Sequence, residues 1–344
     1  IHWDIAVNRK DKIVKRLNCG IAQLLATKGV TVLKGKGTVL ADKRLSVQTE
    51  EGLVTVECGK LILAAGSAPL IPNIKGIDLD GVLTSTEALD MPTLPASIVI
   101  IGAGVVGLEF AAMFRAMGVK VTVIELAERI LPADDSEAAA ELLKIMKRKG
   151  ISFKLSAAVT EIQQTEDGLA VAYTMAEKTY LEPCTKVLVS VGRKLNTDAF
   201  SALPVRVEKG AVCVNEHMET SIPGIYAAGD ITGGYLLAHL AFMEGRVAAE
   251  NAFGLSTKMN YDAVPACVYT APEFATVGIT EQKAALLDIP VKVGRYHFRS
   301  SGRALTLGER EGFVKIIAAQ DHTILGGQIL CANASEMISE LTLA

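Results

Sequence analysis

The chain has 344 residues, which is enough for two or three packed domains because single hydrophobic cores rarely grow beyond roughly 250–300 residues. Half of the residues are hydrophobic and 30 are Gly, the balance of an α/β protein rather than of a disordered or fibrous one. A net charge of -3 without any basic block argues against nucleic acid or an anionic membrane as a partner and favours a small molecule.

Two features of the sequence bear on where the protein works. The longest nearly apolar run, Ile98 to Leu108, falls short of the roughly 20 residues that cross a bilayer, and no charged leader precedes an apolar signal core. The cysteines are scattered singly, as buried thiols in a reducing compartment are; they are Cys19, Cys58, Cys184, Cys213, Cys267 and Cys331. We therefore expect a cytoplasmic protein without a metal site, a disulfide framework or a membrane span.

The N-terminal region predicts one helix followed by short strands. Apolar residues recur with the helical period from Asp4 to Leu25, and Lys28-Gly29 supplies a cation and a glycine at the end. β-like runs follow at 30–33, 37–40, 45–49, 53–58 and 61–65, of which the last is wholly apolar and is expected to be a buried strand. A connector with four prolines, Pro69, Pro72, Pro92 and Pro95, then predicts a domain boundary near Met91.

The pattern from Ser97 to Glu125 predicts one βαβ unit, with a strand at 98–101, a helix at 105–117 and a strand at 120–125. A further helix is predicted from Asp135 to Lys149, with acidic residues first and basic residues last, as the helix dipole favours. Strands are then expected at 186–191 and 225–228, and a helix at 238–252. The last region, 264–344, alternates β-like runs at 267–270, 291–298, 313–318 and 323–330 with turns, and stops inside an apparent helix at 334–344.

The motif with the clearest chemistry is a GxGxxG between a predicted strand and a predicted helix. Gly102 allows the tight turn, Gly104 lets the backbone approach a pyrophosphate, and Gly107 lets the helix lie close to the sheet. The pyrophosphate would rest on the helix N-terminus, where backbone N–H groups and the dipole favour an anion. The motif in this context predicts a dinucleotide site; a strand-turn-helix without a ligand is the alternative.

Glu125 ends the next strand, at about the offset where an acidic residue hydrogen-bonds the adenosine ribose hydroxyls. A carboxylate there repels a 2′-phosphate, so we predict NAD rather than NADP. Arg129, four residues later, is not enough to reverse this preference.

Two further segments carry weak signals. Ala64 to Ser67 and Ala227 to Asp230 each end an apolar strand with small residues, which suits a backbone that approaches a ligand at the carboxyl edge of a sheet. Taken singly, each is better interpreted as an ordinary tight turn. Asp230 could accept from a sugar hydroxyl or cap a helix.

Placed on either side of the GxGxxG unit, these two segments resemble the short motifs that bracket the NAD domain in flavoprotein disulfide reductases. The resemblance covers nearly the whole chain and is strongest for the dihydrolipoamide dehydrogenases. Leu63 to Ser67 resembles the end of the first FAD segment, Val189 to Arg193 the strand that closes the NAD domain, and Gly229 to His239 with Gly245 the second FAD segment. Tyr269 to Glu273 with Val277-Gly278 is similar to the start of the interface domain.

The resemblance implies an α/β fold of the two-dinucleotide-binding-domain flavoprotein type. A Rossmann-like NAD domain is expected to be inserted in a partial FAD domain, followed by a truncated α+β interface or dimerisation domain. The expected segments are 1–90 for the first FAD segment, 91–215 for the NAD domain, 216–262 for the second FAD segment and 263–344 for the interface domain.

It also implies FAD and NAD as cofactors and assigns residues to each. FAD is expected at Gly37, Ala65, Gly66, Ser67, Asp230, Leu236, Leu237, Ala238 and His239, with Asp230 on its ribityl or pyrophosphate part. NAD is expected at Gly102, Ala103, Gly104, Val105, Val106, Gly107, Leu108, Glu109, Glu125, Val159 and Gly192, with Glu109 near the nicotinamide. Without the resemblance, Glu109 would be interpreted as a surface carboxylate, Val159 as core and His239 as a packed histidine.

The chain also departs from the family pattern. It contains no second GxGxxG followed by a close pair of redox cysteines, and no C-terminal His followed at short range by Glu. We therefore expect no catalytic residue in the chain, which begins at Ile1 rather than Met and is expected to be a piece of a longer protein, inactive by itself in thiol exchange. Ala65 stands where the family usually has Thr, and Leu240, Phe242 and Met243 are apolar where polar residues are more usual.

The activity that the resemblance implies is oxidation of protein-bound dihydrolipoamide through a redox-active disulfide and FAD, with hydride transfer to NAD⁺. The expected partners are a second copy of the chain, in a homodimer, and the lipoyl domain of a 2-oxoacid dehydrogenase or glycine-cleavage complex. Two alternatives stay open: another reductase of the class, of mercuric or glutathione type, or an NADH oxidase; and a non-catalytic module that holds NAD or FAD. Glu125 argues against the glutathione type, which usually binds NADP.

Overall fold

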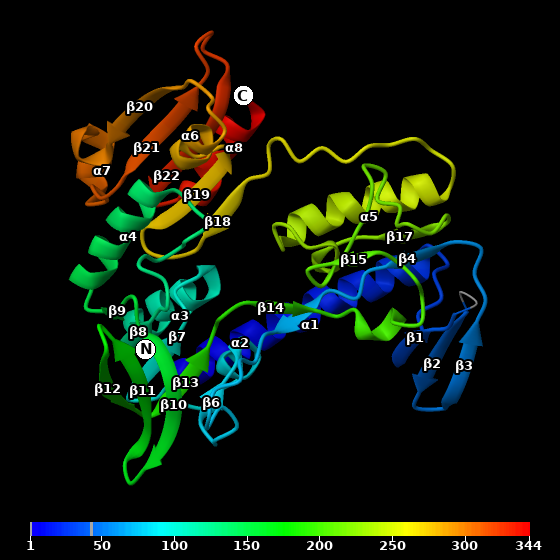
Figure 1. Cartoon of the computed structure of the whole chain (residues 1–344), viewed down its shortest axis with the longest axis horizontal. Helices are drawn as coiled ribbons and strands as arrows, with labels where there is room; N and C mark the ends of the chain where they lie inside the picture. The colour runs from blue at the N-terminus through cyan, green and yellow to red at the C-terminus, as the bar shows by residue number, and fades with distance from the viewer. Residues whose placement is uncertain (1, 42–43) are drawn as a thin grey trace. The chain divides into compact units, whose positions relative to one another are not determined.

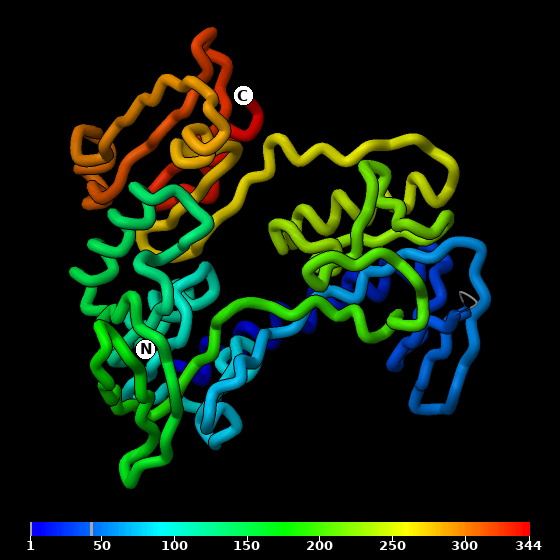
Figure 2. The backbone as a smooth tube through the Cα atoms, viewed as in Figure 1, coloured from blue at the N-terminus to red at the C-terminus, as the bar shows by residue number. Residues whose placement is uncertain are grey.

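The computed structural model describes residues 2–41 and 44–344. Their contacts divide the chain into two compact units (Figure 1). Unit 1 comprises Pro69–Gly192 and Asp262–Ala344, and unit 2 comprises His2–Ala68 and Arg193–Tyr261. The chain therefore passes from one unit to the other three times, and Figure 2 traces its course.

These units divide the chain at other positions than the four segments expected from the sequence. Residues 69–90 belong to unit 1, because strand β6 (Val82–Leu83) pairs with β13 (Lys186–Val189) in the same sheet as the predicted βαβ unit. Residues 193–215 belong to unit 2, because Phe200, Leu203 and Val212 share a core with Leu61 and Leu63. The last division, at 261–262, lies one residue from the expected one.

A five-stranded sheet forms the centre of the first part of unit 1. Its order is β6-β13-β7-β8-β9, and every pair is parallel. The bounds are β7 Ser97–Ile101, β8 Lys120–Ile124 and β9 Ser152–Lys154, with helices α2 Ser85–Leu89, α3 Val105–Ala116 and α4 Ser136–Arg148. Strands β7 and β8 are β-branched and almost wholly buried, as parallel strands covered on both faces are. The predicted βαβ unit is confirmed to within a residue at each end.

A three-stranded antiparallel sheet lies next in the chain. It consists of β10 Ala158–Thr165, β11 Gly168–Met175 and β12 Lys178–Cys184. Its middle strand is buried from Leu169 to Tyr173. The alternate residues Leu169, Val171 and Tyr173 share a core with Ile101 and Ile124, at the carboxyl ends of β7 and β8. The antiparallel sheet therefore packs against the end of the parallel sheet at which the glycine turn begins.

The remainder of unit 1, residues 262–344, forms a five-stranded antiparallel sheet of order β18-β19-β22-β21-β20. Its elements are β18 Ala266–Val268, β19 Glu273–Gly278, α6 Glu281–Leu286, β20 Lys292–His297, η3 Phe298–Ser300, α7 Gly302–Leu307, β21 Phe313–Ala318, β22 Ile324–Cys331 and α8 Ala334–Leu343. Helix α8 covers one face, since Ala334 and Ile338 pack on Ala275 and Ile329. We call this part the C-terminal sheet.

Unit 2 combines one long helix with small sheets. Its elements are α1 Trp3–Thr27, β1 Lys36–Val39, β2 Leu45–Thr49, β3 Gly52–Val56, β4 Leu61–Leu63, β5 Ser67–Pro69, β14 Arg193–Leu195, η1 Asp198–Phe200, β15 Val207–Glu208, β16 Ala211–Val212, β17 Ile225–Ala227, η2 Asp230–Thr232 and α5 Ala238–Ala252. Strands β1, β2 and β3 pair antiparallel, whereas β4 and β17 pair in parallel. The two parallel strands set the position of the candidate site in this unit.

Two predictions for unit 2 are wrong. The apolar run 30–33 is not a strand, because no neighbouring strand pairs with it in the described part of the chain. The run 61–65 is not wholly buried: β4 ends at Leu63, and Ile62 is 38% exposed in a sheet where β17 is the only strand paired with β4 among the described residues. The apolar stripe of α1 is likewise open, with Leu17 and Ile21 more than half exposed.

No helix in the described ranges is both long and apolar enough to cross a membrane.

Candidate functional site

The glycine motif of unit 1 turns the chain from β7 into α3, and its three glycines differ in their surroundings. A Cβ on Gly102, whose φ is +105°, would lie 2.2 Å from the carbonyl oxygen of Ser190. A Cβ on Gly107 would lie 2.2 Å from the oxygen of Gly102. Both glycines are therefore required by the close packing of turn, helix and sheet, as the sequence predicts.

Gly104 is different, because a Cβ there would meet no atom within 4 Å. Its φ of −75° and ψ of −175° are open to any residue, so neither strain nor packing explains the glycine. It is the N-cap of α3 and provides no side-chain cap, so the first N–H groups of a 12-residue helix face this space. An open space at a helix N-terminus fits a pyrophosphate that approaches the backbone.

Glu125 lies directly beside this turn. Its Oε2 accepts a hydrogen bond from the Ala103 N–H at 2.6 Å, and its Oε1 accepts one from the Ala127 N–H at 2.7 Å. The structure therefore brings together the glycine turn and the acidic residue that the sequence assigned to the ribose. A fixed carboxylate at this point can accept from ribose hydroxyls and repels a 2′-phosphate.

Arg129 does not offer its guanidinium to a ligand. One terminal nitrogen donates to the carbonyl oxygens of Leu131 and Asp134, each at 3.1 Å, and the other donates to the carbonyl of Pro132. The Arg129 side chain thus holds the loop that follows Glu125 instead of presenting a cation to a phosphate. This arrangement supports the prediction that Arg129 leaves the preference for NAD unchanged.

The other predicted NAD residues lie around the same turn with different exposure. Val105 is exposed and Val106 half-buried at the first turn of α3, whereas Ala103 and Leu108 are fully buried and cannot present their side chains to a ligand. Val159 packs against the core at the ends of β7 and β8. Gly192 follows β13 with φ +125° and with open space where a Cβ would be.

Glu109, one turn further along α3, is half-buried. Its Oε1 accepts from the N–H of Tyr269 at 2.9 Å. Burial raises the pKa of Glu109, and this hydrogen bond opposes the increase only in part. Glu109 is therefore a fixed carboxylate between α3 and the C-terminal sheet and not the freely solvated surface residue of the alternative interpretation.

In unit 2, the parallel pairing of β4 with β17 brings the two small-residue segments together. Ala227 lies opposite Leu63, and the Ala228 N–H donates to the Leu63 oxygen at 3.0 Å. Just beyond, Ser67 Oγ donates to Asp230 Oδ2 at 2.5 Å across 163 residues of sequence. The two segments that carry weak signals in the sequence thus lie side by side, at the carboxyl ends of two parallel strands.

Arg193 completes this group and was not among the predicted site residues. Its Nε donates to Ser67 Oγ at 2.6 Å and lies 3.7 Å from Asp230 Oδ2, and a terminal nitrogen donates to the Ser67 oxygen at 2.9 Å. Asn196 adds a bond from its side-chain nitrogen to the Ala65 oxygen at 2.9 Å. The only available signal for Arg193 was its position beside Gly192 in the segment that resembles the family.

Glu244 is a second residue that the sequence analysis missed. It is 3% exposed, its Oε2 accepts from the Gly229 N–H at 2.7 Å, and its Oε1 accepts from the Tyr261 hydroxyl at 2.9 Å. Burial raises the pKa of Glu244 despite these hydrogen bonds. The carboxylate holds Gly229, at φ +79°, immediately before Asp230. A charged residue on an otherwise small and apolar stretch of helix was the signal that could have identified it.

The remaining predicted FAD residues differ in their exposure and in their distance along the chain from this group. Leu236 and Leu237 are half-buried, and Ala238 and His239 are exposed in the first turn of α5. Gly66 has φ +65° and open space where a Cβ would be. Gly37 lies apart on β1, and only Val39, two residues later, shares a core with Leu63.

All six cysteines are free thiols. Burial raises the pKa of Cys184 and of Cys331 to about 11, so both thiols stay protonated and unreactive at neutral pH. No cluster of three or more potential metal ligands occurs among residues 2–41 and 44–344.

Comparison with known proteins agrees with this geometry. Residues 2–245 match the family model for pyridine nucleotide-disulphide oxidoreductases, and residues 264–344 match the dimerisation domain of the same family. A dihydrolipoyl dehydrogenase of Bacillus subtilis is 38% identical over the whole chain, which covers 76% of that protein. One of Thermus scotoductus is also 38% identical, over 97% of the chain and 73% of the relative.

Solved structures show the same fold. LpdA from Mycobacterium tuberculosis superposes with a TM-score of 0.91 at 27% identity, over 100% of this chain and 77% of that one. A Cu(II) complex of the HOCl-induced flavoprotein disulfide reductase RclA from Escherichia coli gives a TM-score of 0.90 at 27% identity, over 99% and 78%. From the site geometry and from matches that span nearly all of its residues, the chain belongs to the pyridine nucleotide-disulphide oxidoreductase family.

Proposed function

We propose that the chain is the NAD-binding part, and most of the FAD-binding part, of a dihydrolipoyl dehydrogenase. The observation that carries the proposal is Glu125, a carboxylate fixed by the Ala103 N–H beside an open glycine turn, in a chain whose relatives with that name are 38% identical. FAD, when bound, relays electrons between a dithiol or disulfide and the nicotinamide, which is chemistry that side chains cannot supply.

The residues of unit 1 would bind and orient NAD⁺. The N-terminus of α3 would hold the pyrophosphate in the space left by Gly104, and Glu125 would accept from the adenosine ribose. Glu109, held by the Tyr269 N–H, would border the nicotinamide. Each group is fixed by a backbone contact before a ligand arrives, which lowers the entropy that binding must overcome.

The residues of unit 2 would hold FAD. Asp230, with its carboxylate oriented by Ser67 and Arg193, would accept from hydroxyls of the ribityl chain, while Glu244 fixes the preceding turn. Gly66 leaves the backbone free to approach the cofactor, since a Cβ there would meet no atom within 4 Å. The family's usual Thr is replaced by Ala65, whose carbonyl is held by Asn196.

The proposed partners follow from the same assignment. Residues 264–344 would join two copies of the chain, as the match to a dimerisation domain suggests. The lipoyl domain of a 2-oxoacid dehydrogenase or glycine-cleavage complex would deliver the dithiol, in the cytoplasm. Because no two of the six cysteines are close in sequence, we propose that this segment by itself exchanges hydride between NADH and FAD and does not exchange thiols.

The cofactor assignment is tested by calorimetric titration of the chain with NADH and NADPH. We expect clear preference for NADH, and we expect Glu125→Ser to reduce it at least tenfold, about 1.4 kcal/mol. Glu128→Ser is the matched control, since it removes an exposed carboxylate from the same loop. Equal affinity of the wild-type chain for NADH and NADPH would contradict the assignment.

The substrate assignment is tested on the natural gene product. We expect NADH-dependent reduction of lipoamide and none of glutathione disulfide. The reverse pattern would indicate a glutathione-type reductase and overturn the proposal.

A further inference from the structure

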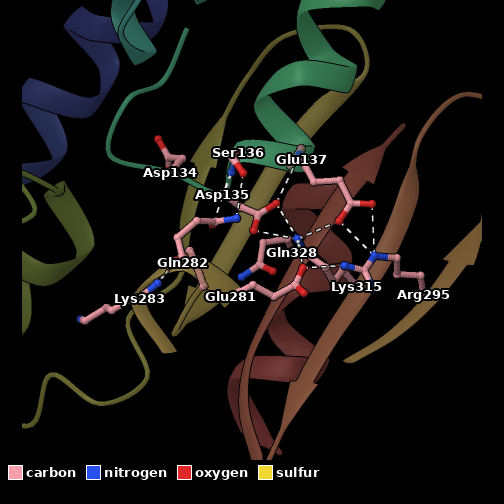
Figure 3. Close-up of polar contacts among 12 residues, drawn as sticks. Asp134, Asp135, Ser136, Glu137, Glu281, Gln282, Lys283, Arg295, Lys315 and Gln328 are labelled. Carbon is pink, nitrogen blue, oxygen red and sulfur yellow. Dashed lines mark hydrogen bonds and ion pairs between the residues drawn. The ribbon is translucent and has the colours of Figure 1, made fainter. Parts of the chain in front are cut away.

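Lys315, on β21 of the C-terminal sheet, lies at the centre of an ion cluster (Figure 3), in which Lys315 and Asp135 are buried. Its side chain is fully buried, and its Nζ lies 2.7 Å from both carboxylate oxygens of Asp135 and 3.0 Å from Glu137 and Glu281. Arg295 from β20 closes the outer side, with bonds to Glu137 and Glu281. Three carboxylates from the beginnings of α4 and α6 thus converge on one amine.

The cluster leaves Lys315 no freedom to turn elsewhere. Burial by itself would lower the pKa of Lys315, but its hydrogen bonds to Asp135, Glu281 and Glu137 outweigh burial and raise it. An ammonium has three N–H donors, and all are spent on carboxylates. Gln328 lies opposite Lys315 on β22, and its buried Oε1 accepts no hydrogen bond from Lys315 or from any other donor in the described part of the chain. Removal of the amine would leave Asp135 buried without its counter-ion.

Asp135 links this cluster to the start of α4. Its Oδ1 accepts from the Ala138 N–H at 3.0 Å as the helix N-cap, and the residue is fully buried. Next to it, the Gln282 side chain donates to Ser136 Oγ at 2.7 Å, a second link between α6 and the same helix turn. The beginning of α4 is therefore held from the C-terminal sheet and not only by its own part of unit 1.

The loop 126–134 connects this point to the glycine turn. Leu131 is buried at φ +46°, a conformation that a leucine keeps only when its surroundings hold it. Its N–H donates to the Ala103 oxygen at 3.1 Å, and Arg129 binds the neighbouring carbonyls. Since the Ala103 N–H also donates to Glu125, a continuous series of contacts runs from Asp135 to the Ala103–Glu125 pair, next to Gly104 in the glycine turn.

We propose that Lys315 is a positioning residue for NAD: by holding Asp135, it fixes the loop 126–134 and through this loop the Ala103–Glu125 pair that receives the adenosine half of the nucleotide. The inference rests on the proposed NAD site. It makes nucleotide affinity depend on the contacts between the C-terminal sheet and the beginning of α4. Lys315 contacts no nucleotide and acts only through Asp135 and the loop.

The test compares the wild-type FAD-loaded chain with Lys315→Met and with the milder Asp135→Asn, which keeps an acceptor for the Ala138 N–H. Calorimetry gives the Kd of NADH, of ADP-ribose and of FAD, well below each melting temperature. We expect the Kd of NADH and of ADP-ribose to rise by the same factor, about tenfold for Lys315→Met, with FAD unchanged. The ADP-ribose result separates the adenosine half from the nicotinamide.

Two controls separate positioning from general stability. Ile338→Ala opens the core beneath α8 and lowers the melting temperature without touching the loop. Arg148→Gln removes an ion pair with Glu311 at the other end of α4. Both should keep the wild-type Kd for NADH.

Each outcome decides one point. A folded Lys315→Met with wild-type affinity overturns the inference, and if that variant does not fold, Asp135→Asn decides in the same way. Equal weakening in Ile338→Ala also overturns it. A wild-type chain that binds no NADH overturns the proposed function, and the inference with it.

Discussion

Gly104→Ala separates the needs of the protein from those of its proposed ligand. The added methyl group would meet no atom within 4 Å, and the backbone at φ −75° suits alanine. Alanine has fewer unfolded conformations than glycine, which favours folding by about 0.4–1 kcal/mol, but it is less favourable than glycine at the N-cap of α3. We therefore expect the stability of the fold to change by less than about 1 kcal/mol. The same methyl group would occupy the space assigned to the pyrophosphate, so the Kd of NADH should rise at least tenfold, about 1.4 kcal/mol.

Replacement of either of the other two glycines of the motif by alanine should destabilise the fold. A methyl group on Gly102 or Gly107 would lie 2.2 Å from a backbone oxygen, which cannot move away as a flexible side chain could. We expect a loss of about 1–3 kcal/mol from overpacking in each, and a further loss of about 1–3 kcal/mol from the positive φ of Gly102.

The assay pairs urea denaturation with calorimetric titration of NADH for each variant. Gly294→Ala is the matched control, because this glycine of the C-terminal sheet also has open space where the Cβ would be. A Gly104→Ala protein that binds NADH as well as Gly294→Ala would refute the assignment of the space to a ligand. A Gly104→Ala protein as unstable as Gly102→Ala would refute the packing argument.

Two further predictions concern unit 2. Burial raises the pKa of Glu244 above its ordinary value of 4.5, so its stabilising contribution is complete below that value and is lost as the pH rises through the folded-state pKa. Glu244→Gln keeps an acceptor for the Gly229 N–H and a contact for Tyr261, and its side chain does not titrate. The melting temperature of this variant, relative to that of the wild type, should therefore rise from acid to neutral pH; a difference in melting temperature that does not depend on pH would contradict this. Ser67→Ala removes the hydroxyl that donates to Asp230 and leaves this carboxylate with only the longer contact to Arg193. We expect the free energy of unfolding to fall by about 1 kcal/mol and the Kd of FAD, measured by equilibrium dialysis, to rise several-fold. An unchanged affinity for FAD would contradict the assignment of Asp230 to the site.

The local parts of the fold were predictable because their signals are contiguous. The strand at 97–101, the helix after Gly104 and the acid that ends the next strand lie within 30 residues, and the alternation of β-branched, glycine and helical patterns determines each of them. The structure then confirms that Glu125 lies beside the turn, since adjacent parallel strands end at the same edge.

The contacts between distant segments were not predictable in the same way. Asp135 could be recognised as a helix N-cap, but its bond to Lys315 spans 180 residues and depends on how the C-terminal sheet packs on α4. The same is true of Arg193 with Ser67, 126 residues apart. Glu244 was visible in the sequence only as a carboxylate on a predicted helix, which does not reveal the backbone N–H that it accepts from.

The boundary expected near Met91 shows a related limit. A proline-rich connector indicates an exposed stretch of chain but not which sheet the flanking strand joins. Strand β6 lies within that connector, between Pro72 and Pro92, and it pairs with β13 in the sheet of the glycine motif. Strand partners at this distance depend on tertiary packing, which no local pattern encodes.

The most direct test of the account is anaerobic mixing of the FAD-loaded protein with NADH, followed through the absorbance of the flavin. Retention of FAD together with rapid loss of its oxidised absorbance on addition of NADH, and much slower loss with NADPH, is the result that the account predicts. A protein that retains no FAD, or whose flavin stays oxidised in the presence of NADH, would contradict it.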